Sequence, residues 1–252
     1  MKLLTLARDL KRRKAREKRS LFVAEGIRSV EELLKSKLGI EGALVSPQLG
    51  AAPRGAALLR DLENRGIEVL AVSEKDLESA AETDSPQGVL AIAKIPRHTI
   101  PSAKQAERYR IVVLDGIQDP GNTGTILRTA AAFGAAATLA LPGTVDVWNA
   151  KVIRSSMGSH FRHPVLSITE EELANLLRRE GIELWAADAG GQPLDGSPVP
   201  PKLAVAVGNE GAGLSSTVRG LASRIVAIPI GGEVESLNVA VVTGIILYEL
   251  SK

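Results

Sequence analysis

The stretch Ile111–Phe133, IVVLDGIQDPGNTGTILRTAAAF, predicts a strand, a polar turn and a helix. Ile111–Leu114 is a short aliphatic run, which is typical of a buried strand. Asn122 is a good N-cap for a helix that runs to the end of the stretch. Gly121 and Gly124 let the backbone turn sharply and come close to a ligand. The turn thus follows the carboxyl end of a strand, where α/β proteins keep their ligand sites.

The same alternation continues to the end of the chain. Strands separated by helical crossovers imply a parallel sheet covered on both faces. Neither Gly-x-Gly-x-x-Gly after the first strand nor Gly-x-x-x-x-Gly-Lys-Ser/Thr is present, so neither a dinucleotide nor a nucleoside triphosphate is supported. We expect strands at Ala137–Leu141, Pro164–Val165, Glu183–Ala187, Leu203–Val207 and Arg224–Ile228, and helices at Trp148–Met157, Glu170–Arg179 and Asn238–Leu250.

The first part of the chain predicts a smaller α/β unit. A polar stretch with Pro96 and Pro101 follows it and is the best candidate for a linker. We therefore expect a first domain at 1–95, a linker at 96–109 and a second domain at 110–252. In the first domain, strands are expected at Leu21–Ala24, Gly42–Ser46, Glu68–Val72 and Gly88–Ala93, and helices at Ile27–Lys37, Arg54–Arg65 and Glu74–Glu82.

Composition indicates a globular cytoplasmic protein. Of the 252 residues, 44% are hydrophobic and 24% are charged, which is enough to bury a sizeable core. The chain has no cysteine, which excludes disulfides, cysteine-ligated zinc and a thiol nucleophile and favours a reducing compartment. The three scattered histidines, His98, His160 and His163, predict no metal site. No signal-peptide core and no membrane-spanning run is recognisable, so we expect no membrane partner.

The charge of the chain is unevenly distributed. Residues 1–30 carry a net charge of +7, while the remaining residues carry −5. A basic cluster at one end of a slightly acidic protein indicates a polyanion partner, although a solvated helix face is the simpler explanation for an isolated charge run. With only 3% aromatic residues, phosphate contacts and shape are favoured over base stacking. The candidate polyanion-binding residues are Lys11, Arg12, Arg13, Lys14, Arg16, Lys18 and Arg19.

Two further blocks repeat the pattern of a strand followed by a polar turn. Gly208–Leu214, GNEGAGL, places Glu210 among glycines, where its carboxylate would hold Asn122 or Arg128. Arg128 itself lies in a largely apolar helix, so we expect it to need a partner. The strand that ends at Ile228 leads through a loop at 229–235 into Ser236-Leu237-Asn238, which caps the final helix.

In this order and spacing, the three blocks resemble the signature motifs of the SpoU/TrmH family of RNA 2'-O-ribose methyltransferases, in the knotted SPOUT superfamily. The first domain, with a basic helix, Phe22-Val23-Ala24-Glu25-Gly26 and Ser85-Pro86-Gln87-Gly88, resembles the family's substrate-binding domain. The resemblance implies an α/β trefoil knot with a parallel sheet, preceded by a smaller ribosomal-protein-like RNA-binding domain. It also implies a homodimer through the catalytic domain, in which the final helix, Val239–Leu250, is a plausible part of the interface or else pure core.

The same resemblance assigns functions to individual residues. The cofactor is S-adenosylmethionine, which carries the reactive methyl group. Arg128 holds its proton too tightly to be an easy base, so we expect it to grip a phosphate or the ribose. Ser155-Ser156-Met157-Gly158 also resembles the family's small-residue segment. The expected catalytic residues are Asn122, Arg128, Glu210, Ser236 and Asn238, and the expected cofactor contacts are Ala189, Gly208, Ile228 and Leu237.

Alternatives remain for the function. A separate RNA-binding domain favours ribosomal RNA over transfer RNA, but a tRNA 2'-O-methyltransferase is the nearest alternative. A non-catalytic ribosome-associated RNA-binding protein would explain the basic arm but gives no reason for the polar residues of the three blocks. A small-molecule enzyme of Rossmann type would explain the second domain but not the charge of residues 1–30.

Overall fold

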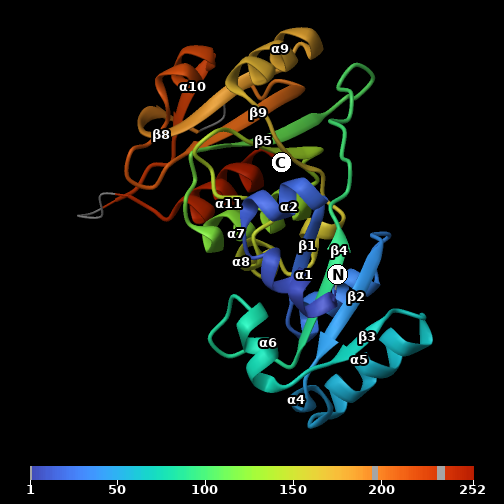
Figure 1. The fold of residues 1–252 in the computed structure, drawn as a ribbon. Coiled ribbons are helices and arrows are strands. Elements are labelled where there is room, and N and C mark those ends of the chain that lie inside the picture. The colour runs from blue at the N-terminus through green and yellow to red at the C-terminus, as the bar shows by residue number, and fades with distance from the viewer. Residues whose placement is uncertain (1, 195–197, 232–235) are drawn as a thin grey trace. The chain divides into compact units, whose positions relative to one another are not determined.

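The computed structural model describes residues 2–194, 198–231 and 236–252, and most of the loop expected at 229–235 lies outside them. The chain forms two compact units (Figure 1). Unit 1 comprises Met1–Arg97 and Trp148–Arg162, and unit 2 comprises His98–Val147 and His163–Lys252. The chain therefore leaves unit 2 after Val147 and re-enters it at His163.

Unit 1 is built on a four-stranded sheet in the order β1-β4-β2-β3. β4 runs antiparallel to both β1 and β2, while β2 and β3 are parallel. The expected strands and helices are confirmed, with shorter α3 and α6, and α1 and the short α4 are additional. The strands are β1 (Leu21–Glu25), β2 (Ile40–Val45), β3 (Val69–Ala71) and β4 (Val89–Lys94), and the helices are α1 (Leu3–Asp9), α2 (Arg13–Arg19), α3 (Ile27–Leu34), α4 (Pro47–Gly50), α5 (Pro53–Asn64) and α6 (Glu74–Ala80).

An aromatic cluster joins α8 (Ala150–Ser155) and the 3-10 turn η1 (Ser159–Phe161) to the sheet of unit 1. The fully buried ring of Phe22 lies 5.0 Å from Trp148 and 5.8 Å from Phe161, measured between ring centroids. Trp148 in turn meets the imidazole of His160 edge-on at 4.2 Å. Aromatic pairs at these separations bury large apolar surfaces. Residues 148–162 are therefore part of the core of unit 1, although they are distant from it in sequence.

Unit 2 contains a six-stranded parallel sheet in the order β10-β8-β9-β5-β6-β7. This confirms the parallel sheet expected from the alternation of strands and helices. β8 extends six residues beyond its expected end at Ala187, and α10 was not expected. The strands are β5 (Tyr109–Asp115), β6 (Ala137–Ala140), β7 (Val165–Ser167), β8 (Glu183–Pro193), β9 (Lys202–Gly208) and β10 (Arg224–Ala227), and the helices are α7 (Pro120–Ala132), α9 (Glu170–Glu180), α10 (Ser216–Leu221) and α11 (Val239–Glu249).

Helices cover both faces of this sheet (Figure 1). Alternate residues of β5 point to opposite faces, as the pleat of a strand requires. Ile111 and Val113 pack in one cluster with α9 and α10, whereas Val112 and Leu114 pack in another with α7 and α11. All four side chains are fully buried, which explains why the strand reads as an uninterrupted apolar run.

Strand register determines where the polar turns lie. In the parallel pair β5 and β9, Leu114 is opposite Val207 and Asp115 is opposite Gly208. The turns that follow these two strands therefore begin side by side at the carboxyl edge of the sheet, as ligand-binding turns do in α/β proteins. Among the helices in the described part of the chain, none is both long enough and apolar enough to cross a membrane.

We expect His163 to make unit 2 sensitive to acid. Burial, with a smaller contribution from His98, lowers the pKa of His163 to about 4, and His163 Nε2 lies 2.8 Å from Thr138 Oγ1. In the unfolded state His163 gains a proton near pH 6.5, and in the folded state it does not. The contribution of His163 to the free energy of unfolding should therefore be fully present above pH 6.5 and fall by up to about 3 kcal/mol as the pH drops to 4. Urea denaturation at pH 7 and pH 4 should show that His163→Gln removes this part of the fall, and an unchanged fall in the variant would contradict the assignment.

Candidate active site

A chain of side-chain hydrogen bonds joins the three polar blocks. Asn122 Nδ2 donates to Glu210 Oε1 at 2.9 Å, and Asn238 Nδ2 donates to Asn122 Oδ1 at 2.9 Å. The expectation that Glu210 holds Asn122 agrees with this geometry. Both functional atoms of the Asn122 amide have a partner, so its orientation is fixed from two sides. The structure therefore brings together three of the five residues predicted to be catalytic.

Asp119, not Asn122, is the N-cap of α7, so the predicted cap was wrong. Asp119 Oδ1 accepts a hydrogen bond from the backbone N–H of Asn122 at 2.6 Å, and Pro120 occupies the first turn. Aspartate is as good a cap as asparagine, and proline is favoured at the first helical position, so the earlier start is the more stable one. Asn122 is thereby placed inside the first turn, and its amide is released from capping to face Glu210.

A tight loop after β9 presents Glu210. Asn209 and Gly213 exchange backbone hydrogen bonds at 3.0 and 2.9 Å across the loop. The Asn209 side chain accepts from the N–H groups of Gly211 and Ala212 and donates to the carbonyl of Gly116 at 2.8 Å, which fastens the loop to the end of β5. The sequence reasoning missed Asn209, although an asparagine that opens a glycine-rich turn is a known signal for this Asx geometry.

Asn238 confirms the predicted cap of the final helix. Its Oδ1 accepts from the N–H of Ala240 at 2.9 Å, and the same side chain donates to Asn122 through Nδ2. One asparagine thus starts α11 and fixes that helix start against α7. Ser236 lies two residues earlier and lines the adjacent cavity.

A cavity of about 420 Å³ opens beside this chain of hydrogen bonds. That volume suits a nucleoside-sized ligand. The cavity has mixed polar and apolar walls, and Glu210, Ser236 and Asn238 are on its boundary. All four expected cofactor contacts line it: Ala189, Gly208, Ile228 and Leu237.

Gly208 allows two segments of backbone to meet at the wall of the cavity. A Cβ atom at this position would lie 2.5 Å from the carbonyl carbon of Gly213, closer than real Cβ contacts. The loop around Glu210 therefore closes only because residue 208 has no side chain. Asp188 also lines the cavity and forms an ion pair with Arg219 beside Gly213. The sequence reasoning missed both residues.

Arg128 lies on the exposed face of α7 and does not line the cavity. It is six residues beyond Asn122, which places it roughly 240° around the helix from that residue. The side chain of Arg128 is in solvent rather than among the apolar residues of the helix, so the expected need for a partner does not arise from burial. It makes no hydrogen bond or ion pair with any residue that the structure describes, so the guanidinium is available to a bound molecule.

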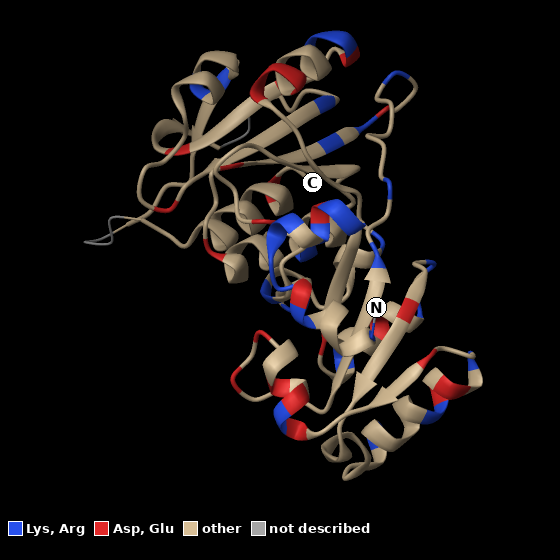
Figure 2. Cartoon of the chain, in the orientation of Figure 1, with Lys and Arg blue, Asp and Glu red and all other residues tan. Residues whose placement is uncertain are grey.

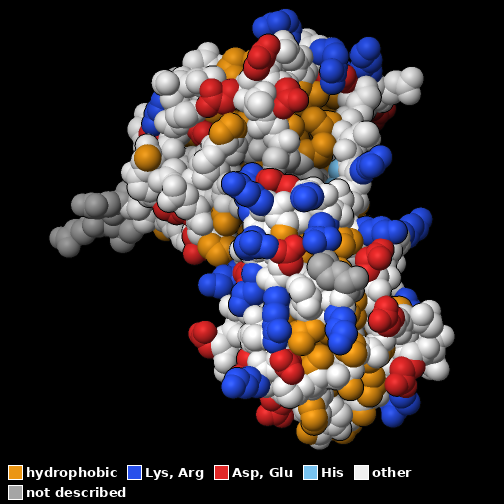
Figure 3. All heavy atoms as spheres, viewed as in Figure 1, with side chains coloured by type: hydrophobic (Ala, Val, Ile, Leu, Met, Phe, Trp, Pro, Cys, Tyr) orange, Lys and Arg blue, Asp and Glu red, His pale blue; other side chains and the backbone are white. Residues whose placement is uncertain are grey.

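The basic residues of the N-terminal arm divide into two groups. Six of the seven candidates are exposed on α2 and the turn before it (Figures 2 and 3). Arg16 is only 4% exposed, and its Nη1 donates to the carbonyl oxygens of Leu10 and Lys11 at 2.7 and 2.8 Å. Arg16 therefore stabilises the turn between α1 and α2. The exposed group consists of Lys11, Arg12, Arg13, Lys14, Lys18 and Arg19.

Comparison with protein families and known structures agrees with this geometry. Residues 109–248 match the SpoU rRNA Methylase family, and residues 5–91 match the MRM3-like substrate binding domain. Over 244 residues the chain is 34% identical to the 23S rRNA (guanosine(2553)-2'-O)-methyltransferase RlmP of Bacillus subtilis, with 96% of this chain and 93% of that protein covered.

Two solved structures show the same fold across both units. The SpoU methyltransferase AviRb of Streptomyces viridochromogenes, in complex with AdoMet, has a TM-score of 0.87 and 27% identity and covers 98% of this chain and 96% of that one. The AdoMet-bound rRNA methyltransferase of Sinorhizobium meliloti has a TM-score of 0.80 and 29% identity, with 98% and 93% covered. The family resemblance and the fold class are confirmed. The family model matches more than half of the chain, and a relative is 34% identical across both units. The chain therefore belongs to the SpoU rRNA methylase family.

Proposed function

We propose that the protein transfers a methyl group from S-adenosylmethionine to a ribose 2'-hydroxyl of ribosomal RNA. The observation that carries this proposal is the hydrogen-bonded chain of Glu210, Asn122 and Asn238 at the edge of a nucleoside-sized cavity. The named relatives support the chemistry, because RlmP is a 23S rRNA 2'-O-methyltransferase and the two solved structures hold AdoMet.

The cavity residues suit the cofactor. Backbone groups at Ala189, Gly208, Ile228 and Leu237 would hold it, with the aliphatic side chains of Ile228 and Leu237 against its apolar parts. When bound, S-adenosylmethionine supplies an electrophilic methyl group on a sulfonium centre. The close approach of the backbone at Gly208 leaves this wall free of side chains, as a ligand held by main-chain groups requires.

The polar residues would act on the RNA. Ser236, Asn122 and Asn238 offer hydroxyl and amide groups that can orient the ribose hydroxyl, and Glu210 keeps the Asn122 amide in place. Arg128, exposed and unpaired among the described residues, would bind a phosphate flanking the target ribose. An arginine does not give up its proton readily, so its contribution is to position the RNA and polarise the hydroxyl. Alignment of this kind supplies a large share of the rate in group transfer.

The N-terminal segment would supply affinity for RNA. The six exposed basic residues of the arm form a positive surface over α2, and salt-dependent phosphate binding is what such a surface provides. We therefore propose the division expected from the sequence, in which residues 1–95 bind the substrate, residues 96–109 connect and residues 110–252 carry out the reaction. It is amended in that residues 148–162 belong to unit 1 and residues 98–109 to unit 2. A separate binding domain favours ribosomal RNA, and the match of residues 5–91 to a substrate binding domain supports this division.

Three finer expectations are part of the proposal. A trefoil knot at the C-terminal end is supported by the path from β10 at the edge of the sheet to α11, which packs against α7. A cytoplasmic location follows from the proposed substrate. A homodimer is supported by exposed apolar side chains on and beside α11, where Val241 is 50% exposed and Tyr248 is 53% exposed. Phe133, 39% exposed, meets Tyr248 edge-on with 6.4 Å between ring centroids.

Substitution of Gly208 tests the cofactor site. In Gly208→Ala the new Cβ would collide with the backbone of Gly213, so the loop must shift and the affinity for S-adenosylhomocysteine should fall at least about tenfold. The matched control is Gly220→Ala on α10, whose Cβ would meet nothing within 4 Å and which does not line the cavity. Isothermal titration calorimetry should give near wild-type binding for the control, and equal binding by both variants would place the cofactor elsewhere.

Transfer of labelled methyl groups tests the reaction itself. The substrates are total rRNA and total tRNA without native modifications, and one label that resists alkaline cleavage is expected in rRNA. Arg128→Ala and Glu210→Ala should each lower kcat by about 100-fold, whereas Glu210→Gln, which keeps an acceptor for Asn122, should lower it by about tenfold. Label only in tRNA would change the substrate, and no label together with no binding of S-adenosylhomocysteine would leave a non-catalytic RNA-binding protein.

Sedimentation tests the dimer. The wild type should sediment at twice the chain mass of 26.6 kDa. The double variant Val241→Glu/Tyr248→Glu places two carboxylates on the exposed apolar surface of α11 and should sediment as a monomer. Val199→Glu is the control, because Val199 is also exposed, at 38%, but lies outside α11. A monomeric wild type, or a dimer that the double variant leaves intact, would contradict this interface.

A further inference from the structure

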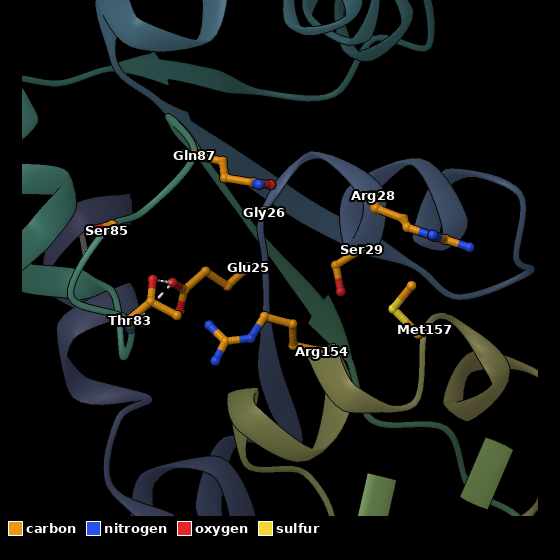
Figure 4. Close-up of a pocket in the computed structure, with 9 residues that line it drawn as sticks. All are labelled: Glu25, Gly26, Arg28, Ser29, Thr83, Ser85, Gln87, Arg154 and Met157. Atoms are coloured by element: carbon orange, nitrogen blue, oxygen red, sulfur yellow. Dashed lines mark hydrogen bonds between the residues drawn. The ribbon is translucent and has the colours of Figure 1, made fainter. Parts of the chain in front are cut away.

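A second pocket, of about 230 Å³, lies within unit 1 beside the N-terminal end of α3 and α8 (Figure 4). Its walls come from segments far apart in the sequence: Arg28 and Ser29 are on α3, Thr83 and Gln87 precede β4, and Arg154 is on α8. Figure 4 shows the side chains of Glu25, Ser29 and Arg154 around the same space. The active site described above is in unit 2 and uses none of these residues.

Helix α3 begins at this pocket without a side-chain cap. Its N-cap is Gly26, at φ +90°, which has no side chain to accept hydrogen bonds. Gln87 Oε1 accepts from the N–H of Ile27 at 3.1 Å, but the N–H groups of Arg28 and Ser29 have no acceptor among the described residues. Free N–H groups and the positive end of the helix dipole favour an anion at this position.

Ser29 is an independent indication of a ligand. The residue is 6% exposed, and its Oγ has no hydrogen-bond partner among the residues that the structure describes. Figure 4 shows this hydroxyl directed into the space between Arg154 and Met157. Buried hydroxyl groups nearly always have a partner, because leaving one unpaired is costly. The hydroxyl is therefore a donor aimed at a group that the protein itself does not provide.

Two arginines and one glutamate line the pocket. Neither Arg28 nor Arg154 makes an ion pair with a residue that the structure describes, and Figure 4 shows the exposed side chain of Arg28 extending away from Glu25 and Arg154. Glu25 is already engaged, because it accepts from the N–H groups of Glu82 and Thr83 at 3.0 and 3.2 Å and from the Thr83 hydroxyl. Burial raises the pKa of Glu25, with Arg154 acting in the opposite direction. The positive charge inside the pocket is thus that of Arg154 and of the helix end, and Arg28 contributes at the exposed rim.

The turn after α8 fixes Arg154 beside α3. Gly158 lies so close to α3 that a Cβ there would be 2.5 Å from Glu32 Cβ, and Arg162 bonds the Glu32 carboxylate at 3.1 Å. Arg154 is therefore presented by a segment held at two points rather than by a free loop. Such a support is what a preformed binding site requires.

We propose that this pocket binds a phosphodiester group of the substrate RNA, an inference that rests on the proposed function. The uncapped N–H groups of α3 and the Ser29 hydroxyl donate to the phosphate oxygens, Arg154 balances their charge, and Arg28 adds positive charge at the exposed rim. The pocket adds a shaped contact to the exposed positive surface of the arm. Because residues 148–162 complete the pocket, the RNA-binding surface proposed for unit 1 includes a part of the chain that matches the methylase family rather than the substrate binding domain.

Salt dependence of RNA binding tests this proposal. The full chain is titrated with transcribed 23S rRNA from 50 to 200 mM KCl, and Arg28→Gln and Arg154→Gln are compared with the wild type. Each lost phosphate contact should reduce the slope of log affinity against log salt by roughly 0.7–0.9, with affinity on the order of tenfold weaker at low salt. Arg60→Gln is the control, because it removes the same charge from an exposed position on α5 away from the pocket.

Ser29→Ala separates ligand binding from folding. Removal of an unpartnered hydroxyl should leave the melting temperature unchanged or higher, yet weaken RNA binding several-fold and raise KM for RNA without changing kcat. If Arg28→Gln and Arg154→Gln give the same salt slope as Arg60→Gln while the enzyme still methylates rRNA, this inference is overturned and the proposed function stands. A wild type that neither binds rRNA nor transfers methyl would overturn both.

Discussion

The hydrogen bonds from Glu210 through Asn122 to Asn238 are the contacts on which the rest of the active site depends. They connect the segments that follow β5, β9 and β10, and each amide is used in both of its roles, as donor and as acceptor. An aspartate at position 122 would place a second carboxylate against Glu210 and would have no N–H to give it. The network therefore requires an amide at its centre, with a carboxylate on one side and a second amide on the other.

Two backbone features make that network possible. Parallel register places Asp115 opposite Gly208, so the turns after β5 and β9 begin together. Gly208 then lets the Glu210 loop fold back onto Gly213, which any side chain would prevent. The same loop forms a wall of the cavity, so the geometry that positions Glu210 also shapes the cavity. In the proposed function, orientation of the substrate and binding of the cofactor would therefore depend on the same loop.

The sequence predicts the helices and strands of this protein better than it predicts which residues contact one another. Apolar runs such as Ile111–Leu114 identify buried strands, because both faces of a parallel sheet are covered. The pairing of Glu210 with Asn122 could be anticipated from charge, but the N-cap at Asp119 could not be chosen over Asn122, because both residues cap helices equally well. Arg16 illustrates a different limit: in a run of basic residues, nothing in the sequence distinguishes the one whose guanidinium turns inward to bond backbone carbonyls.

The packing of residues 148–162 in unit 1 could not be predicted either, because the sequence pattern identifies helices and strands but not the distant segments against which they pack. The segment is flanked in sequence on both sides by residues of unit 2, but it supplies Trp148 and Phe161 to the aromatic core around Phe22. Unit 1 is therefore joined to unit 2 by three chain crossings rather than by a single linker. Without this segment, residues 1–97 would leave the ring of Phe22 without two of its packing partners. The stability of unit 1 therefore depends on residues that match the methylase family rather than the substrate binding domain.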